Sequence, residues 1–252
     1  MIDSPPRARE ALVDLFASVP VWKAFIESAV EDGLGEVRAD DLEAPSAAVL
    51  FYGGLVIYAG DAASPAAGAL VRAFAVQPLV LAWDQSWNSL LEAAYGDAVR
   101  RSVRYHMPFE SLDPAVTERM IRADASGVRP ARTSDVERLA DALGWEHQLV
   151  HYRDAEDFVR RGFPRVVERD GEIVAGASAF CRSSAHAECQ VTVAEEHRMQ
   201  GLGTAVAAAF VEACTEARVT VPWDAANAES VAVGRRVGYR SVKEYEVLEI
   251  VP

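Results

Sequence analysis

The sequence has few of the features that mark membrane-spanning, exported or disulfide-bonded proteins. Its longest mostly apolar stretch, residues 47–60, is interrupted by glycines and is shorter than the roughly 20 residues that a membrane helix needs. The N-terminus has neither a basic segment nor an apolar core, so we expect no signal peptide. The three cysteines, Cys181, Cys189 and Cys214, have no C-x-x-C spacing, which predicts buried thiols in a reducing compartment. These absences favour a cytoplasmic protein without a membrane partner.

Positive charge is also scarce. The chain has 25 Lys and Arg against 38 Asp and Glu, a formal net charge of −13 over 252 residues. The net charge is −8 for residues 1–126 and −5 for the rest, so neither half is basic. This argues against nucleic acid or an anionic membrane as the main partner and is compatible with a cationic small-molecule acceptor, such as an amine. Half of the residues are hydrophobic, as expected of a globular protein with one large domain or two modest ones.

The first 125 residues contain no reactive constellation, but their apolar patterns are typical of an α/β domain. Residue spacing predicts helices over 7–17, 21–30, 64–75 and 86–95, a β-hairpin of 47–52 and 55–59, strands over 79–83 and 99–107, and a short helix after Pro114. Asp61 and Asp84 are predicted to cap the third and fourth of these helices. The small and polar residues 123–127 are typical of a linker, so we place the domains at 1–125 and 126–252.

The second half alternates strands and helices. We expect strands over 128–131, 166–168, 172–180, 188–193, 219–223 and 241–250. We also expect four helices: one that contains Leu139, one from Trp145 to Phe158, one that contains 206–217, and one over 228–236. Ser134 and Glu137 are predicted to form a capping box.

One stretch stands out chemically. The strand over 188–193 is followed by a polar turn with Gly201 and Gly203, and then at once by a helix. A glycine turn lets the backbone approach a ligand, and the helix N-terminus attracts negative charge, so this order is typical of a phosphate site. The turn is not a Walker loop, because G-K-[ST] is missing. Nor is it a complete G-x-G-x-x-G, because Val206 stands at the third glycine position.

The segment from Arg198 to Gly203, Arg-Met-Gln-Gly-Leu-Gly, fits R-x-x-G-x-G and resembles the pyrophosphate loop of the GNAT acyl-CoA N-acyltransferases. Residues 221–239 resemble the next strand of that family, its Asn-led helix and its closing Gly-aromatic pair. Trp223-Asp224 is most similar to the branch of the zwittermicin-resistance acetyltransferases. The resemblance implies a mixed, mostly antiparallel sheet flanked by helices over 126–252, beside the N-terminal α/β domain.

The resemblance also implies an activity: transfer of an acetyl group from acetyl-CoA to the amine of a small molecule, such as an antibiotic or a metabolic intermediate. Two alternatives stay open, namely a non-catalytic acyl-CoA sensor or scaffold, and a transferase with another acyl-CoA or an aminoacyl-tRNA as donor. The negative charge disfavours tRNA. The N-terminal domain is expected to serve acceptor specificity or interactions, and both monomer and homodimer stay open.

For the donor, the family pattern implies contacts from the backbones of Val191 and Val193, from Arg198, and from the loop amides. The full set of implied donor-binding residues is Val191, Val193, Arg198, Gln200, Gly201, Gly203, Thr204 and Asn227. Many relatives carry Lys or Arg where this chain has Gln200. An N-cap role would account equally well for Asn227.

For catalysis, the family pattern places a proton-accepting carboxylate at Glu188, which an exposed strand glutamate would equally explain. The position of the usual thiolate-facing tyrosine holds Gly234, so the general acid is unassigned. The expected acceptor contacts are Trp145, His147, His151, Asp154, Trp223 and Asp224. His147 and His151 are four residues apart, which suits a metal, but no third ligand has the right spacing and we expect none.

Overall fold

The computed structural model describes residues 6–73 and 79–251 and divides the chain into two compact units. The first unit consists of residues 1–104 and 244–252, and the second of residues 105–243. The boundary that the linker composition suggests, at 125/126, lies inside the second unit. In the part of the chain that the structure describes, no helix is long and apolar enough to cross a membrane.

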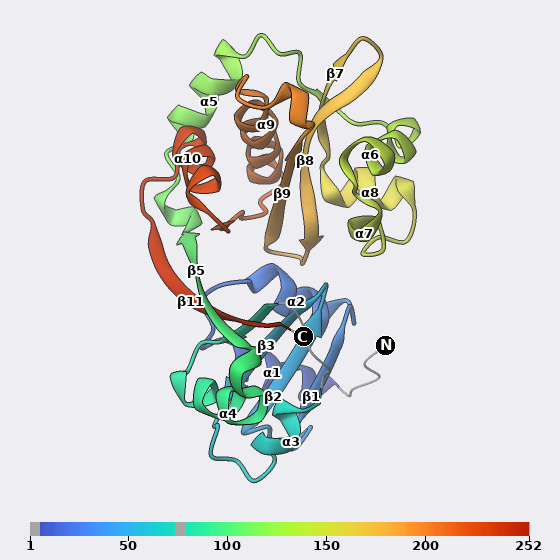
Figure 1. Cartoon of the computed structure of the whole chain (residues 1–252). Coiled ribbons are helices and arrows are strands. Elements are labelled where there is room, and N and C mark those ends of the chain that lie inside the picture. The colour runs from blue at the N-terminus through green and yellow to red at the C-terminus, as the bar shows by residue number, and fades with distance from the viewer. Residues whose placement is uncertain (1–5, 74–78, 252) are drawn as a thin grey trace. The chain divides into compact units, whose positions relative to one another are not determined.

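The first unit is built on a sheet with helices. Its elements are α1 (Pro6–Phe16), α2 (Lys23–Glu31), β1 (Glu36–Ala39), β2 (Ala47–Tyr52), β3 (Leu55–Gly60), α3 (Ala67–Val71), β4 (Leu79–Ala82), α4 (Gln85–Tyr95), β5 (Val99–Met107) and β11 (Lys243–Ile250) (Figure 1). The strand order is β1-β2-β3-β4-β11-β5, in which β3 and β4 are parallel. The predicted hairpin is therefore confirmed, and Asp84 caps α4 by accepting a bond from Ser86 N at 2.9 Å.

Apart from one predicted helix that is split in two, the second unit has the order of elements that the sequence predicts, with an antiparallel sheet of strand order β6-β7-β8-β9. Its elements are α5 (Pro114–Ala123), β6 (Arg129–Pro130), α6 (Val136–Leu143), α7 (Glu146–Leu149), α8 (Ala155–Gly162), β7 (Arg165–Arg169), β8 (Glu172–Arg182), β9 (Ala187–Val193), α9 (Leu202–Glu216), β10 (Trp223–Ala225) and α10 (Ala228–Val237). Strand β10 pairs with residues 105–107 of β5, which also belong to the second unit. The fold class is thus the expected one, mixed and mostly antiparallel.

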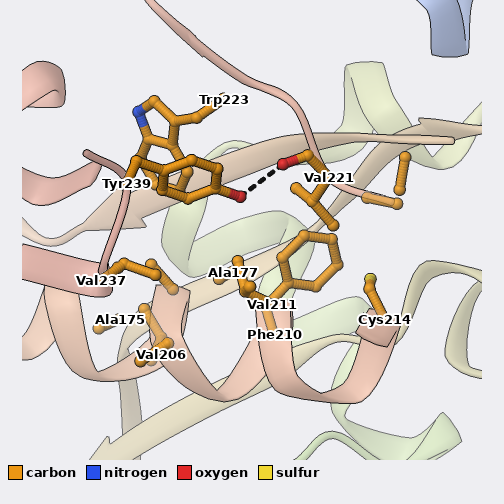
Figure 2. Close-up of a cluster of buried hydrophobic side chains, with 14 of the residues drawn as sticks. Ala175, Ala177, Val206, Phe210, Val211, Cys214, Val221, Trp223, Val237 and Tyr239 are labelled. Carbon is orange, nitrogen blue, oxygen red and sulfur yellow. Dashed lines mark hydrogen bonds between the residues drawn. The ribbon is translucent and has the colours of Figure 1, made fainter. Parts of the chain in front are cut away.

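The core of the second unit lies under α9, which contacts β7, β8 and β9 and is flanked by α5 and α10 (Figure 1). Figure 2 shows Val206, Phe210 and Val211 of α9 in one cluster with Ala175 and Ala177 of β8. The small alanines let the helix approach the sheet closely. A separate core, around Trp145 and the helices α6 and α8, packs on β8 and β7.

Several local predictions are wrong, each because a side chain caps a different position. Asp61 accepts from Ala63 N and begins a turn, while α3 covers only 67–71; residues 74 and 75 of the predicted helix lie outside the described part. The carboxylate of Asp135 accepts from Arg132 N at 2.8 Å, so a 3₁₀ turn replaces the Ser134 capping box. Asp154 caps α8 by accepting from Asp157 N at 2.8 Å, which splits the long helix predicted from 145 to 158.

Two strand predictions also need correction. The strand predicted over 219–223 forms later, at 223–225, because its ladder is made with β5. Strand β1 was not predicted at all; it is a short edge strand whose alternating half-buried and exposed residues carry little apolar signal.

Candidate active site

Strand β9 is the edge strand of its sheet, and its ladder of hydrogen bonds is with β8. On its other side, the bonds Ala187 N to Thr220 O and Thr220 N to Ala185 O, both 2.9 Å, join it to the chain leading into β10. Beyond this single parallel bridge, at His186 and Thr220, the described parts of β9 and β10 belong to different sheets. The two strands therefore start together and separate toward the glycine turn.

The backbone of β9 presents polar groups to the side where the strands separate. Ala187 N bonds toward β10, whereas Ala194 N bonds to Val174 O of β8 at 2.9 Å. Successive residues of a strand alternate in the direction of their backbone N–H and C=O groups. The N–H and C=O groups of Val191 and Val193 therefore point away from β8. An extended ligand with amide groups, such as the pantetheine arm of CoA, could pair with these groups in the manner of an added strand.

The glycine turn that follows has the backbone that the sequence predicts. Gly201 has φ +82°, in the left-handed region, and is the N-cap of α9. The N–H groups of the first turn of α9 have no carbonyl before them in the helix, so they and the helix dipole can hold an anion. Met199 also has positive φ and is 98 % exposed, so the tip of the turn projects outward.

Gly203 lies in a closely packed position. A Cβ at this position would lie 3.3 Å from Val193 Cγ2 and 3.8 Å from Val191 Cγ1. The glycine therefore lets the first turn of α9 lie close on β9, which brings the strand backbone and the helix N-terminus together.

The side chains of the turn have distinct positions. Arg198 is exposed, and its Nε donates to Val193 O at 3.4 Å, so it lies over the end of β9. Gln200 is exposed and donates to Glu196 O at 3.4 Å. Thr204 is 4 % exposed, so its hydroxyl is buried and only its backbone amide belongs to the helix N-terminus.

Residues of β9 and β10 divide between two faces. The odd-numbered Val191, Val193 and Trp223 belong to the core under α9 and α10. The even-numbered Thr192 lies on the opposite face, where its Oγ1 accepts from Trp145 Nε1 at 2.9 Å. Since side chains of a strand alternate, Glu188 is on the same face of β9 as Thr192, and Asp224 is on the face of β10 opposite to Trp223. Both carboxylates are half-buried.

The residues expected to contact the acceptor differ in their exposure. Trp145 is fully buried and supports β9 instead of lining a surface. His147 is exposed, and His147 and His151 have ring centroids 5.9 and 4.7 Å from that of Phe180. Burial lowers the pKa of His151 to about 4, with a smaller contribution from His147, so His151 is neutral at pH 7.

Trp223 is 4 % exposed and donates through Nε1 to Ser230 Oγ at 3.2 Å, so it packs inside the core and offers little surface to an acceptor. Asn227 caps α10 by accepting from Ser230 N at 2.9 Å, which leaves its amide NH₂ group as the donor for a ligand. Tyr239 is 1 % exposed and donates to Val221 O, as Figure 2 shows, and burial raises the pKa of its phenol well above the usual range.

Gly234 faces Met107 and Trp223. A Cβ at position 234 would lie 2.7 Å from Met107 Sδ and 3.2 Å from Trp223 Cδ1. Met107 of β5 and Trp223 of β10 therefore fill the space beside position 234.

A further polar residue, His106, was missed by the sequence analysis. In the antiparallel pair of β5 and β10, it is directly opposite Asp224, while Met107 is opposite Trp223. Directly opposite residues share a face, so His106 joins the polar face of Asp224. Alternation along β5 was visible in the sequence, but the pairing with β10 was not. Among the described residues, no group of three or more His, Cys, Asp or Glu could hold a metal ion.

Comparison with known proteins agrees with this geometry. A family model described as GNAT acetyltransferase matches residues 14–248. An uncharacterised N-acetyltransferase of Bacillus subtilis (strain 168), YdfB, is 21% identical over 164 residues, which are 64% of this chain but only 62% of that protein.

Two solved structures illustrate the likeness. A GCN5-related N-acetyltransferase-like protein from Streptococcus suis 89/1591 superposes with a TM-score of 0.81 at 26% identity, covering 96% of this chain and 98% of that one. An acetyltransferase of the GNAT family from Colwellia psychrerythraea has a TM-score of 0.54 at 11% identity, covering 96% and 97%, and shows the fold alone.

Proposed function

Because the chain belongs to the GNAT acetyltransferase family, we propose that it transfers an acetyl group from acetyl-CoA to the amine of a small molecule. The observation that carries the proposal is the edge strand β9, whose outward backbone groups lead directly into the glycine turn at the N-terminus of α9. One strand edge for an amide-bearing arm and one helix N-terminus for its pyrophosphate suit an acyl-CoA.

Each part of the site would then have a distinct role in binding the donor. The N–H groups of β9 that point away from β8 hold the pantetheine arm and polarise the thioester carbonyl. The N–H groups at the start of α9, with Arg198, hold the pyrophosphate. Holding both substrates side by side converts a bimolecular attack into an effectively unimolecular one.

Glu188 is the proposed proton acceptor. An alkylammonium ion must lose a proton before its nitrogen can attack the thioester carbon, and a carboxylate on the polar face of β9 can take this proton directly or through water. The amine nitrogen then forms the new C–N bond, the C–S bond breaks, and the sulfur leaves as a thiolate. The nitrogen loses its second proton as the amide forms, and water carries this proton to the thiolate, because Gly234 offers no hydroxyl.

The polar face also supports an amine as the acceptor. Glu188, Asp224 and the net charge of −13 favour a cationic ligand, and the aromatic pair of Phe180 and His147 offers a further surface for one. We include antibiotics and metabolic intermediates in the acceptor class.

A steady-state assay tests the proposal: release of CoA thiol from acetyl-CoA with a panel of amines, using Glu188→Gln as the control. We expect turnover that depends on the amine and on Glu188. Binding of CoA without transfer to any amine would favour a sensor or scaffold, and turnover with another acyl-CoA or with aminoacyl-tRNA alone would replace the donor.

A further inference from the structure

A groove of about 400 Å³ lies on the α5 side of the glycine turn. It is lined by the end of α5 and the loop after it, by the glycine turn and the start of α9, and by one arginine of β7. The lining residues are Met120, Ala123, Asp124, Ala125, Ser126, Arg169, Gln200, Gly201, Leu202 and Ala205. Its volume is in the range of small-molecule sites, about 300–1,000 Å³. All of these residues belong to the second unit.

Arg169 is the cation of this groove. It is the last residue of β7, it is half-buried, and its Nη1 donates to Glu168 O at 2.9 Å. Within the described residues no carboxylate lies within 4 Å of its guanidinium, whereas the neighbouring Arg129 and Arg138 both pair with Glu168. The remaining N–H groups of Arg169 are thus available for an anionic ligand.

The two arginines beside the glycine turn lie on different sides of it. Arg198 bonds Val193 O, which points away from β8 toward the side where β9 and β10 separate. Arg169 instead lies with Gln200 and Gly201 in the groove beside α5. A ligand whose pantetheine arm follows β9 and whose pyrophosphate is on α9 must place its remaining part, the adenosine 3′-phosphate, beyond the turn.

The groove has the composition that this part of the ligand needs. Met120, Ala123 and Ala205 give apolar surface for a purine ring. Asp124 accepts from Ser126 N at 2.9 Å and keeps acceptor capacity for an amino or hydroxyl group, which adenosine supplies. Gln200 brings no charge, and the chain as a whole carries −13, so a phosphate here needs a local cation.

We propose that Arg169 binds the 3′-phosphate of coenzyme A in this groove, in place of the basic residue that the turn lacks at Gln200. The inference rests on the proposed acyl-CoA donor, and it assigns to Arg169 a part in choosing between CoA and ligands without the 3′-phosphate. A guanidinium matches a phosphate in a bidentate manner, which a lysine cannot do.

A thermodynamic cycle that combines an Arg169 substitution with removal of the 3′-phosphate from the ligand tests this assignment. The dissociation constants of CoA and dephospho-CoA are measured by calorimetry for the full chain, Arg169→Gln and Arg169→Met. We expect the unaltered protein to prefer CoA by about tenfold, a typical value for one charge-assisted contact at a half-exposed site. Both variants should lose this preference by binding CoA about tenfold more weakly and dephospho-CoA as before.

Two further variants serve as comparisons. Arg198→Gln should weaken both ligands equally, because the pyrophosphate is common to them. Arg122→Gln, which removes an exposed arginine of α5 paired with Glu118, should change the affinity for neither ligand.

The assignment would be overturned if Arg169→Gln weakened the binding of both ligands equally. It would also be overturned if a variant with unchanged melting temperature bound CoA as tightly as the unaltered protein. If the unaltered protein binds no CoA, the proposed function fails; if it binds CoA with the predicted cycle but acetylates no amine, only the enzymatic activity fails.

Discussion

Met107 fills the space that a side chain at position 234 would need: a Cβ on Gly234 would lie 2.7 Å from the Met107 sulfur. The contact is between the last residue of β5 and α10, and both residues belong to the second unit. The contact leaves little room for a side chain at position 234, where the family resemblance leads one to expect a tyrosine.

The first prediction concerns this contact. Gly234→Ala should destabilise the protein by about 1–3 kcal/mol, because the added methyl group overpacks a closed core. In the double variant with Met107→Ala, the methyl group has room, so the loss should be smaller than the sum of the two single losses. Urea denaturation measures all three variants, and strictly additive losses would show that the two residues do not compete for one space.

The second prediction is that Glu188→Gln lowers kcat by about 10²–10⁴-fold at neutral pH and leaves the dissociation constant of CoA unchanged. The deficit should shrink as pH rises, since the amine then loses its proton without help. Gln190→Glu on the same face is a matched comparison: it adds a carboxylate two residues away and should not restore activity to Glu188→Gln. A deficit that is the same at every pH would remove the proton-accepting role.

A third prediction tests the glycine turn. CoA at 100 times its dissociation constant should stabilise the fold by about 2.7 kcal/mol, visible as a higher melting temperature. Gly203→Val should abolish this shift, because its side chain pushes α9 away from Val193 on β9. Combining it with Val193→Ala should restore part of the shift. A full shift in Gly203→Val would mean that the close approach of α9 and β9 is not what binds CoA.

The fourth prediction concerns His151, whose pKa is lowered from 6.5 to about 4 by burial. Between these two pH values the unfolded chain binds a proton that the folded chain excludes. The contribution of His151 to stability is therefore complete above about pH 6.5 and is lost as pH falls toward 4.

NMR titration of the His151 ring should give the low pKa directly, and His151→Gln should flatten the fall of the melting temperature between pH 6.5 and 4. His147→Gln should leave most of that fall in place, because His147 is the smaller cause of the shift. An ordinary pKa for His151 would show that its ring is more hydrated than the structure has it.

The sequence predicted the part of the site that depends on local order along the chain. The strand before Arg198, the two glycines and the helix from Leu202 are contiguous, so their periodicity and turn chemistry were readable. The caps Asp84 and Asn227 were found for the same reason.

What the sequence did not give depends on which segments pair across long distances. His106 opposes Asp224 only because β5 pairs with β10, more than a hundred residues later. The same pairing turns Trp223 toward α10, so two adjacent residues expected at the acceptor separate onto opposite faces. Arg169 reaches the groove beside Gln200 through the end of a hairpin, which no spacing in the sequence reveals.

The central claim is that the edge of β9 and the glycine turn hold acetyl-CoA for transfer to an amine. The most direct measurement is mass spectrometry of a metabolite extract incubated with the protein and isotope-labelled acetyl-CoA. The account predicts at least one amine that gains the labelled acetyl group with the unaltered protein, and far less of this product with Glu188→Gln or Gly203→Val. Tight binding of CoA without a labelled acceptor, or equal labelling with all three proteins, would contradict it.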